Sequence, residues 1–391
     1  MSFHARSFSP GRPTLTPLGG LLPYDRPTVT GLLEITDKGH GYLRQPDKRY
    51  RPMPMDPYVP SDIIKRAMLR PGVTVTANYG PNRKGPGPLV TFVNQVNGMP
   101  LREFANSPQF GDLTVIDPRE RIKLETLGGP ISMRILDLLT PIGKGQRGLI
   151  VAPPKTGKTT ILKEIALATL QNHPDMKVFI LLIDERPEEV TDFRRSVPGA
   201  EVWASNTDED IDSHVRTARM VIEQAKRLVE AGKHVMVILD SITRVARAFN
   251  HYVGSSGRTM SGGIDAQAMQ EPRSMLGAAR NIEHGGSMTI IASALIDTGS
   301  RMDELIFQEF KGTGNMELVL SKKLAERRIW PAIDLAASGT RKEEILLGFE
   351  AARKAGLLRR DLLGRDPVSA METLASTLKK FPSNDSFLKS F

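Results

Sequence analysis

Apolar residues follow two different rhythms along the chain. Between residues 28 and 96, short alternating runs (GLLEI, GYLR, VTVTANY and LVTFVNQV) are separated by Gly, Pro, Asn and Asp. A period of two between turn-forming residues is typical of short strands. We therefore expect a small all-β unit, with one short helix over residues 61–66 that has Ser61 as its N-cap.

Farther along, long apolar strands alternate with amphipathic helices. The predicted strands are RGLIVA (147–152), KVFILLID (177–184), HVMVILD (234–240) and SMTIIASALID (287–297). The clearest helices are ILKEIALATLQN and HVRTARMVIEQAKRLVEAG, the second closing at Gly232. Val-, Ile- and Leu-rich strands that alternate with helices predict an α/β fold with a parallel sheet covered on both faces.

These patterns divide the chain into four parts. Residues 1–27 are rich in Pro and Gly, and we expect a disordered tail rather than a targeting peptide. Residues 28–96 form the β unit, residues 97–130 a linker, and residues 131–391 the α/β domain with C-terminal helices. No apolar run approaches the roughly 20 residues of a membrane span, so we expect a cytoplasmic protein without membrane contact.

The charge distribution points to a polyanion. The net charge is +9, and residues 1–110 hold 14 Lys and Arg against 7 Asp and Glu, so +7 lies in this part. A basic unit attached to a nearly neutral body favours a polyanionic partner, although a solvated basic face explains the charge equally well. The chain has no Cys, which excludes disulfides and thiolate metal sites.

The segment IVAPPKTGKTT (150–160) is close to the phosphate-binding motif GxxxxGK[ST]. Ala152 replaces the first glycine, and Pro153 and Pro154 supply no N–H, so an anion would be held mainly from the following lysine onward. Gly157 keeps the backbone close to the phosphates. A strand before the segment and a helix after it are the context that this motif requires. The predicted nucleotide contacts are Lys155, Thr156, Gly157, Lys158, Thr159 and Thr160.

Two neighbouring strands are expected to end in carboxylates. In α/β sheets, ligands bind at the carboxyl ends of the strands. Asp240 has the place of a carboxylate that orients the water shell of a metal, or it caps the next helix. Glu185 could polarise a water for attack on the γ-phosphate, or it forms a surface pair with Arg186.

A third feature lies downstream in AERRIWPAIDLAASGTRKEE. Trp330 offers an aromatic face that could stack on a base, although taken alone it would more often be a core residue. Arg328 and Arg341 are candidates to neutralise charge in a transition state, or they are surface cations.

Several long segments resemble the Rho family of bacterial transcription termination factors. The resemblance runs from about Ile116 to the terminal NDSFLKSF, and it is carried by APPKTGKTT, LLIDERPEEVTDFRRSV, LDSITRVARAFN, SGGIDAQAM, GAARNIEHGGSMTIIASALIDTGSRMDE, FKGTGNMEL and SGTRKEE. It implies a homohexameric ring of RecA-like P-loop ATPase domains that hydrolyse ATP at subunit interfaces. The family's own loop reads A-P-P-K-x-G-K-T, which accounts for Ala152 and the prolines.

The resemblance also implies roles for the residues of the ATP site. Lys155, Lys158 and Thr159 match the contacts to phosphate and Mg²⁺. Glu185 matches the catalytic carboxylate, and Asp240 matches the Walker-B aspartate at the metal. Arg341 matches the arginine finger that reaches a neighbouring subunit, and Arg328 assists it. Trp330 matches the aromatic residue against adenine, and Arg186 is one further predicted nucleotide contact.

Two groups of RNA contacts follow from the resemblance. Two loops of the ring would grip single-stranded RNA in the central hole, around Thr259 to Gly262 and at Arg301. The front unit would be an RNA-binding OB or cold-shock-like barrel. Bases of the RNA would stack on His40, Tyr42 and Tyr58 of this barrel, and Arg44 would contact the RNA backbone.

The front unit departs from the family pattern in two places. His40 replaces an aromatic, and Gly85-Pro86-Gly87 stands where the family has Glu-Arg-Tyr. These departures leave the base preference open. A barrel that only packs against the ring is the alternative to RNA binding by this unit.

The function that we favour is an RNA-dependent ATPase and helicase that translocates 5′ to 3′ and releases nascent RNA from RNA polymerase. One alternative is another RecA- or F1-like ring ATPase without an RNA substrate, which the basic GYLR-containing unit argues against. The other is an RNA-binding module with an inactive ATP site, which the complete set of predicted catalytic residues argues against.

Overall fold

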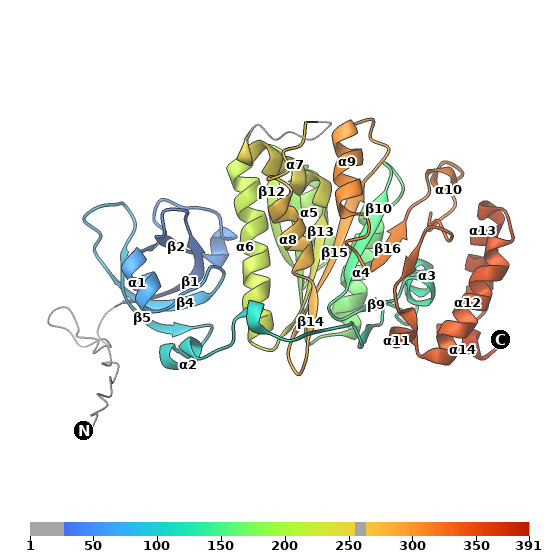
Figure 1. The fold of residues 1–391 in the computed structure, drawn as a ribbon, viewed down its shortest axis with the longest axis horizontal. Helices are drawn as coiled ribbons and strands as arrows, with labels where there is room; N and C mark the ends of the chain where they lie inside the picture. Colours follow the sequence, from blue (N-terminus) through green and yellow to red (C-terminus); the bar gives the residue numbers. More distant parts are fainter. Residues whose placement is uncertain (1–26, 255–262, 391) are drawn as a thin grey trace, which may run out of the picture.

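The computed structural model describes residues 27–254 and 263–390, and it places a small sheet beside a much larger one (Figure 1). Apart from Pro27, the predicted N-terminal tail lies outside these residues. The predicted RNA loop around Thr259 and Gly262 lies outside them as well. Among the described residues, no helix combines the length and the apolar character needed to cross a bilayer.

The smaller sheet is a closed barrel. Its strands lie in the order β3-β2-β1-β4-β5-β6, and β3 also pairs with β5 through Tyr58 and Leu89. This last pairing closes the sheet, because it joins β3 at one end of the order to β5 near the other end. The prediction of a small all-β barrel is therefore confirmed. The strands are β1 (Thr28–Ile35), β2 (Gly41–Arg44), β3 (Tyr58–Val59), β4 (Thr74–Gly80), β5 (Leu89–Val96) and β6 (Met99–Pro100).

The short helix of the barrel, α1 (Ser61–Arg66), has the predicted bounds but not the predicted cap. Pro60 occupies the N-cap position with φ −61° and ψ 147°, and no side chain caps the helix. Because Ser61 is already the first helical residue, it stands one position too late to cap the helix. The N-cap prediction for Ser61 is therefore wrong.

Residues 97–130, expected to be a linker, contain β6 and several further short elements. Phe104 of α2 (Leu101–Ala105) is 2% exposed and packs in the core of the barrel. After it come η3 (Phe110–Asp112), β7 (Val115–Ile116) and β8 (Arg121–Ile122), of which β7 pairs with a strand of the larger sheet. Sequence patterns missed these elements because each has only two to five residues, too few to show a period.

The larger sheet has a parallel centre with strands in the order β12-β11-β13-β15-β10-β16. Four of these strands match the predicted ones to within one or two residues: β10 (Arg147–Ala152), β11 (Met176–Glu185), β13 (His234–Asp240) and β15 (Ser287–Leu295). The sequence analysis did not predict β12 (Glu201–Asn206) and β16 (Met316–Val319), which are short and carry polar residues. Antiparallel additions to this sheet are β14 (Arg280–Ile282) beside β15 and β17 (Gly339–Thr340) beside β16. A separate two-stranded sheet is formed by β8 and β9 (Ile142–Gly143).

Helices cover both faces of this sheet, as predicted. Alternate residues of β11 enter two separate cores: Ile180 points to one core, and its neighbour Phe179 to the other. The first core includes residues of α3 (Ile131–Leu139), α4 (Lys158–Asn172), α5 (Pro187–Ser196), α10 (Lys322–Glu326), α12 (Phe349–Leu363), α13 (Pro367–Leu378) and α14 (Asn384–Lys389). The second includes residues of α6 (Ile211–Glu230), α7 (Ile242–Val253), α8 (Gln270–Gly277) and α9 (Arg301–Phe310). The remaining short helix, α11 (Glu343–Leu347), precedes α12 in the helical C-terminal region, also predicted.

The barrel is attached to the larger sheet by an aromatic stack. The rings of Tyr50, in the loop after β2, and Trp203, on β12, lie 4.4 Å apart at 4° between planes. Two polar contacts flank the stack: Arg51 pairs with Glu209 at 2.7 Å, and Arg216 donates to the Tyr50 carbonyl at 3.0 Å. Tyr50 has φ +56°, a conformation that its position over Trp203 and the bond from Arg216 hold in place.

We expect Trp203→Ala to destabilise the protein strongly. Trp203 is 4% exposed and packs in the second core, so its removal should lower the free energy of unfolding by about 3–5 kcal/mol. The matched control is Trp330→Ala, because Trp330 is the only other tryptophan and is 45% exposed. Trp330→Ala should lower the free energy of unfolding by less than about 0.5 kcal/mol. Urea unfolding followed by circular dichroism checks both values, and equal midpoints for the two variants would contradict the expected role of the stack.

Candidate functional site

The predicted P-loop connects β10 to α4. Ala152 ends the strand with an ordinary extended backbone, so its replacement of glycine creates no strain. Lys155 and Gly157 have φ +63° and +84°, and Gly157 is the N-cap of the 15-residue α4. The loop is fastened by the buried Thr156 hydroxyl, which donates to the Pro153 carbonyl at 2.7 Å. The free N–H groups at the start of α4 suit the binding of an anion.

Lys158 brings together the two predicted carboxylates. Its ammonium group forms an ion pair with Asp240 and lies 3.8 Å from Glu185 Oε1. Side chains of β13 point alternately to the two faces of the sheet, which explains why Asp240 reaches Lys158. Met236 and Ile238 point into the first core, which contains α4, and Asp240 continues the same face of the strand.

Asp240 is fully buried, and only one of its two oxygens is satisfied. Oδ1 accepts a hydrogen bond from Ser293 of β15 at 2.7 Å and pairs with Lys158. Oδ2 has no hydrogen-bond partner among the described residues, a costly arrangement unless another group binds there. The capping of α7, the alternative role of Asp240, belongs instead to Ser241, whose side chain accepts from the Arg244 N–H.

Glu185 is a buried carboxyl group rather than a surface one. It is 2% exposed and follows a bulge at Asp184, which has φ +55° and shifts the register between β11 and β12. Such bulges re-aim the side chains next to them. Burial and the charge of Asp240 raise the pKa of Glu185 to about 7, while Lys158 and Arg244 act in the opposite direction.

The partner of Glu185 is Arg244, which the sequence analysis did not single out. Arg244 Nε lies 3.3 Å from Glu185 Oε1, and its guanidinium also donates to the Asp184 carbonyl. Arg186, the alternative partner, is exposed at the N-cap of α5. The sequence did contain a sign of this contact: Arg244 stands in the first turn of the helix that follows Asp240. An arginine in that turn lies beside the end of the neighbouring strand.

Trp330 lies against the P-loop. A Cβ atom at Gly157 would lie 3.0 Å from Trp330 Cζ3, so the indole ring is packed closely on the loop, and the φ of +84° at this position favours glycine. With 45% of its surface exposed, Trp330 is not a core residue. The ring is therefore placed where a base could stack beside bound phosphates.

The two candidate arginines lie at opposite ends of the sheet. Arg328 follows α10, two residues from Trp330, and is exposed. Arg341 follows β17, which pairs with the first residues of β16, and these in turn pair with Gly148 at the start of β10. The P-loop follows Ala152 at the other end of β10, about 13 Å farther along the strand. Arg341 is therefore outside the ATP site of its own chain.

Three aromatic rings meet on the barrel. The ring centroids of His40 and Tyr42 are 5.6 Å apart, those of His40 and Tyr58 5.3 Å, and those of Tyr42 and Tyr58 5.7 Å. Tyr42 and Tyr58 are opposite each other on β2 and β3, which fixes their spacing. All three residues are partly exposed, so they form a ring cluster on which unpaired bases can stack.

Arg44 does not have the position expected of a contact to the RNA backbone. It is 6% exposed and pairs with Glu34 at 2.5 Å and with Asp56 at 2.6 Å. Its guanidinium carbon lies 4.8 Å from the centroid of the Tyr42 ring. Two carboxylates already satisfy this buried cation, so the geometry corrects the prediction: Arg44 supports Tyr42 from beneath instead of binding phosphate.

The predicted RNA loops of the ring are described only in part. Arg301 is the exposed first residue of α9, after the N-cap Ser300. A Cβ atom at Gly263 would lie 3.9 Å from Met302, so the described end of the first loop adjoins the second.

Comparisons with known proteins agree with both parts of the molecule. A model of the nucleotide-binding domain of the ATP synthase alpha/beta family matches residues 132–340, and a model of the Rho termination factor RNA-binding domain matches residues 29–102. Among solved structures, a prototypical ATPase of the type III secretion system of pathogenic bacteria has a TM-score of 0.56 and 25% identity, over 64% of this chain and 70% of that one. An ATP synthase subunit of Nanoarcheaum equitans, 18% identical, has a TM-score of 0.55 over 68% of this chain and 69% of that one, and shows the fold alone.

Curated relatives are much more similar in sequence. The transcription termination factor Rho of Aquifex aeolicus is 49% identical over 365 residues, which cover 92% of this chain and 84% of that protein. Rho of Cereibacter sphaeroides is 50% identical and Rho of Escherichia coli 49%, each covering 92% of this chain and 86% of the relative. Because this similarity spans the barrel, the ATP site and the C-terminal helices together, the chain belongs to the Rho family of transcription termination factors.

Proposed function

We propose that the protein is an RNA-dependent ATPase and helicase that moves 5′ to 3′ along nascent RNA and releases it from RNA polymerase in the cytoplasm. The observation that carries this proposal is the presence, in one chain, of a P-loop with two buried carboxylates beside it and a barrel with an exposed ring cluster. The relatives named Rho support the role in termination.

Residues of the ATP site have separable roles in this proposal. Lys158 and the N–H groups at the start of α4 bind the phosphates, and Trp330 stacks on the adenine. Glu185 accepts the proton of the attacking water, for which a pKa near 7 is well matched to neutral pH. Arg244 orients Glu185, because its two contacts hold the carboxylate and the preceding carbonyl together.

The residues also fit a magnesium ion. Mg²⁺ prefers oxygen ligands, and proteins usually hold it by one or two carboxylates together with substrate phosphates and waters. Asp240 offers its unsatisfied Oδ2, and Thr159, in the first turn of α4, offers a partly exposed hydroxyl. When bound, the ion would neutralise charge on the phosphates.

The position of Arg341 supports a ring of identical subunits. An arginine at the far end of the sheet cannot act in its own ATP site, but in a head-to-tail ring the same arginine can face the site of the next subunit. We therefore propose a homohexamer in which Arg341, assisted by Arg328, completes each ATP site. RNA in the central hole would contact Arg301 and the loop around Thr259 and Gly262.

A ring ATPase without an RNA substrate is the second candidate. It is favoured by the likeness of residues 132–340 to the ATP synthase family and by the fold shared with a secretion ATPase. The ring cluster of the barrel argues against it, because His40, Tyr42 and Tyr58 have no evident task in such an enzyme.

Single-stranded RNA should strongly stimulate ATP hydrolysis by the purified protein. The rate is measured without RNA and with poly(C), poly(U) and poly(A). Lys158→Ala should lower the stimulated rate by about 100-fold or more, because it removes the cation at the phosphates. Lys163→Ala, on the same helix but paired with Asp192, should leave it unchanged. Hydrolysis that ignores RNA would favour the second candidate.

The pH dependence of hydrolysis should report Glu185. Because its pKa is raised to about 7, the carboxyl group is protonated below that pH and cannot accept a proton. The ratio kcat/KM for ATP should therefore rise about tenfold per pH unit below pH 7 and level off above it. Asp192→Asn, which changes an exposed carboxyl group of α5, should give the same profile as the wild type. A wild-type profile that stays flat through pH 7 would exclude Glu185 as the base.

Mixing two inactive variants should restore hydrolysis if Arg341 acts between subunits. Arg341→Ala and Glu185→Gln would each be inactive alone, but in mixed rings some interfaces combine an intact Glu185 with an intact Arg341. Random mixing in equal amounts makes about a quarter of the interfaces complete. Arg353→Ala, an exposed arginine of α12, is the control for loss of surface charge. Absence of recovery in rings that demonstrably exchange subunits would place Arg341 outside the site.

A further inference from the structure

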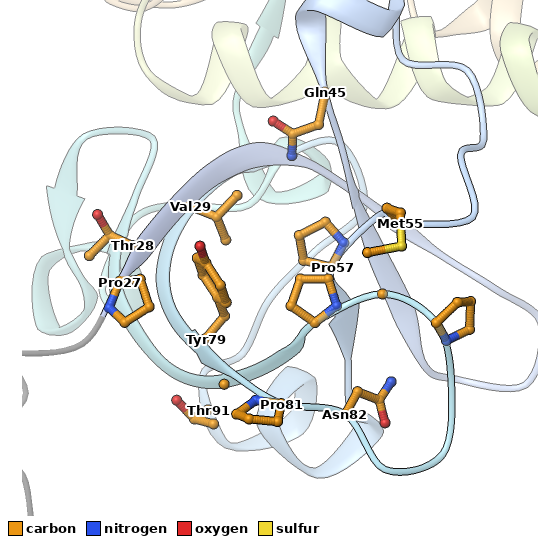
Figure 2. Close-up of a pocket in the computed structure, with 14 residues that line it drawn as sticks. Pro27, Thr28, Val29, Gln45, Met55, Pro57, Tyr79, Pro81, Asn82 and Thr91 are labelled. Carbon is orange, nitrogen blue, oxygen red and sulfur yellow. The ribbon is translucent and has the colours of Figure 1, made fainter.

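One end of the barrel contains a groove that has no role in the function described so far (Figure 2). It lies where β1 and β5 begin and where β2 and β4 end, and its volume is about 1010 Å³. Clefts that hold drug-sized ligands have about 300–1,000 Å³, so the groove has room for at least one nucleotide.

The walls of the groove are apolar and rigid, with one aromatic ring. Tyr79 at the end of β4 contributes the ring, and Pro27, Pro57 and Pro81 are among the prolines around it (Figure 2). Proline and tyrosine present flat surfaces that lose little conformational freedom when a ligand binds, and an aromatic face stacks on any nucleobase.

Polar groups at the rim suit a nucleobase with a phosphate attached. Asn82 and Gln45 line the groove with amide groups, of which the Gln45 Nε2 donates to the Leu43 carbonyl at 3.1 Å. Arg83 and Lys84, which follow Asn82 in the loop between β4 and β5, form no ion pair with a carboxylate of the described residues. Their charges remain available for a phosphate.

The groove is continuous with the ring cluster of the barrel. Pro57 lines the groove, and the next residue, Tyr58, belongs to the cluster. Pro88, which also lines the groove, accepts a hydrogen bond from the Tyr58 N–H through its carbonyl at 2.8 Å. Around the barrel β5 lies between β3 and β4, so RNA that stacks on the ring cluster reaches Tyr79 past the start of β5, where Tyr58 pairs with Leu89.

The unusual Gly85-Pro86-Gly87 stretch shapes the wall. A Cβ atom at Gly87 would lie 2.4 Å from the Asp56 carbonyl oxygen, so the loop can lie directly on residues 55–57 only with glycine at this position. Because Pro86 and Gly87 line the groove, the segment that replaces a family motif is part of the groove itself.

We propose that this groove is an additional subsite for single-stranded RNA, in which a nucleobase stacks on Tyr79 and the adjoining phosphate lies near Arg83 and Lys84. The proposal rests on the proposed RNA binding by the barrel and extends it from the ring cluster to the end of the barrel where β4 ends and β5 begins. An RNA long enough to extend beyond the ring cluster thus gains stacking on Tyr79, which an RNA that covers only the ring cluster lacks.

The test uses the full chain and oligouridylates of about 4 and 10 nucleotides that carry 5-iodouridine. Affinity is measured by fluorescence anisotropy, and photo-crosslinked peptides are identified by mass spectrometry. Tyr79→Leu should weaken binding of the longer RNA by about 5- to 150-fold, the range for the loss of one base stack, and should change binding of the shorter RNA much less. Tyr79→Phe, which keeps the ring, should bind both RNAs as the wild type does. Wild-type protein should form a crosslink to the peptide that contains Tyr79.

The outcomes separate this subsite from the RNA binding on which it rests. If Tyr58→Leu weakens binding while Tyr79→Leu does not, and no crosslink maps to Tyr79, the subsite is overturned and the ring cluster stands. If neither variant changes affinity, RNA binding by the barrel fails as well. If Tyr79→Leu only lowers the melting temperature, the groove serves packing within the chain, which also overturns the subsite.

A second pair of variants keeps the test independent of the folding of Tyr79→Leu. Arg83→Ala combined with Lys84→Ala should reduce the salt dependence of binding to the longer RNA by about one to two phosphate contacts. Arg102→Ala combined with Lys65→Ala changes the same number of exposed charges elsewhere on the barrel and should leave this dependence unchanged. Equal salt dependence for the two double variants would contradict the placement of a phosphate near Arg83 and Lys84.

Discussion

A single lysine ammonium holds two buried carboxylates at the carboxyl edge of the central sheet, and the ATP site is organised around this cluster. Lys158 reaches Asp240 and Glu185 because α4 begins where β10 ends, and because β11 and β13 run parallel to β10 and end at the same edge. Ser293 of the intervening strand β15 fixes Asp240. Burying two negative charges this close together is costly, and the cost appears in the raised pKa of Glu185.

The same edge explains which contacts can form within a subunit and which cannot. Trp330 returns to the P-loop because β16 is parallel to β10 and its following segment emerges on the same side. Arg341 leaves from antiparallel β17 and emerges at the opposite edge. Because β17 runs antiparallel to β16, Arg341 lies at the opposite edge from Trp330 and the P-loop. Trp330 can therefore serve the nucleotide of its own chain, while Arg341 is available to a neighbouring subunit.

The barrel follows a different principle, in which buried charge supports an exposed aromatic surface. Arg44 is neutralised by Glu34 and Asp56 and lies against the Tyr42 ring, so the cation stiffens the cluster without presenting charge to solvent. Tyr50 on Trp203 and Arg51 with Glu209 then fasten the barrel to the ATPase domain. RNA bound on the barrel is thereby held at a defined position relative to the larger sheet.

Features that depend on local pattern were visible in the sequence, and features that depend on distant partners were not. The P-loop, the four long strands and the two carboxylates could be identified because apolar periodicity and motif spacing are properties of neighbouring residues. The aromatic residues of the barrel were identified through the resemblance to the Rho family. Strand pairing, the burial of Arg44, the contact of Arg244 with Glu185 and the side of the sheet taken by Arg341 were decided by tertiary structure. These depend on which segments meet in space, at sequence separations that run from 10 residues for Glu34 and Arg44 to 59 for Glu185 and Arg244. A side chain's charge and burial are set by that meeting rather than by its own identity.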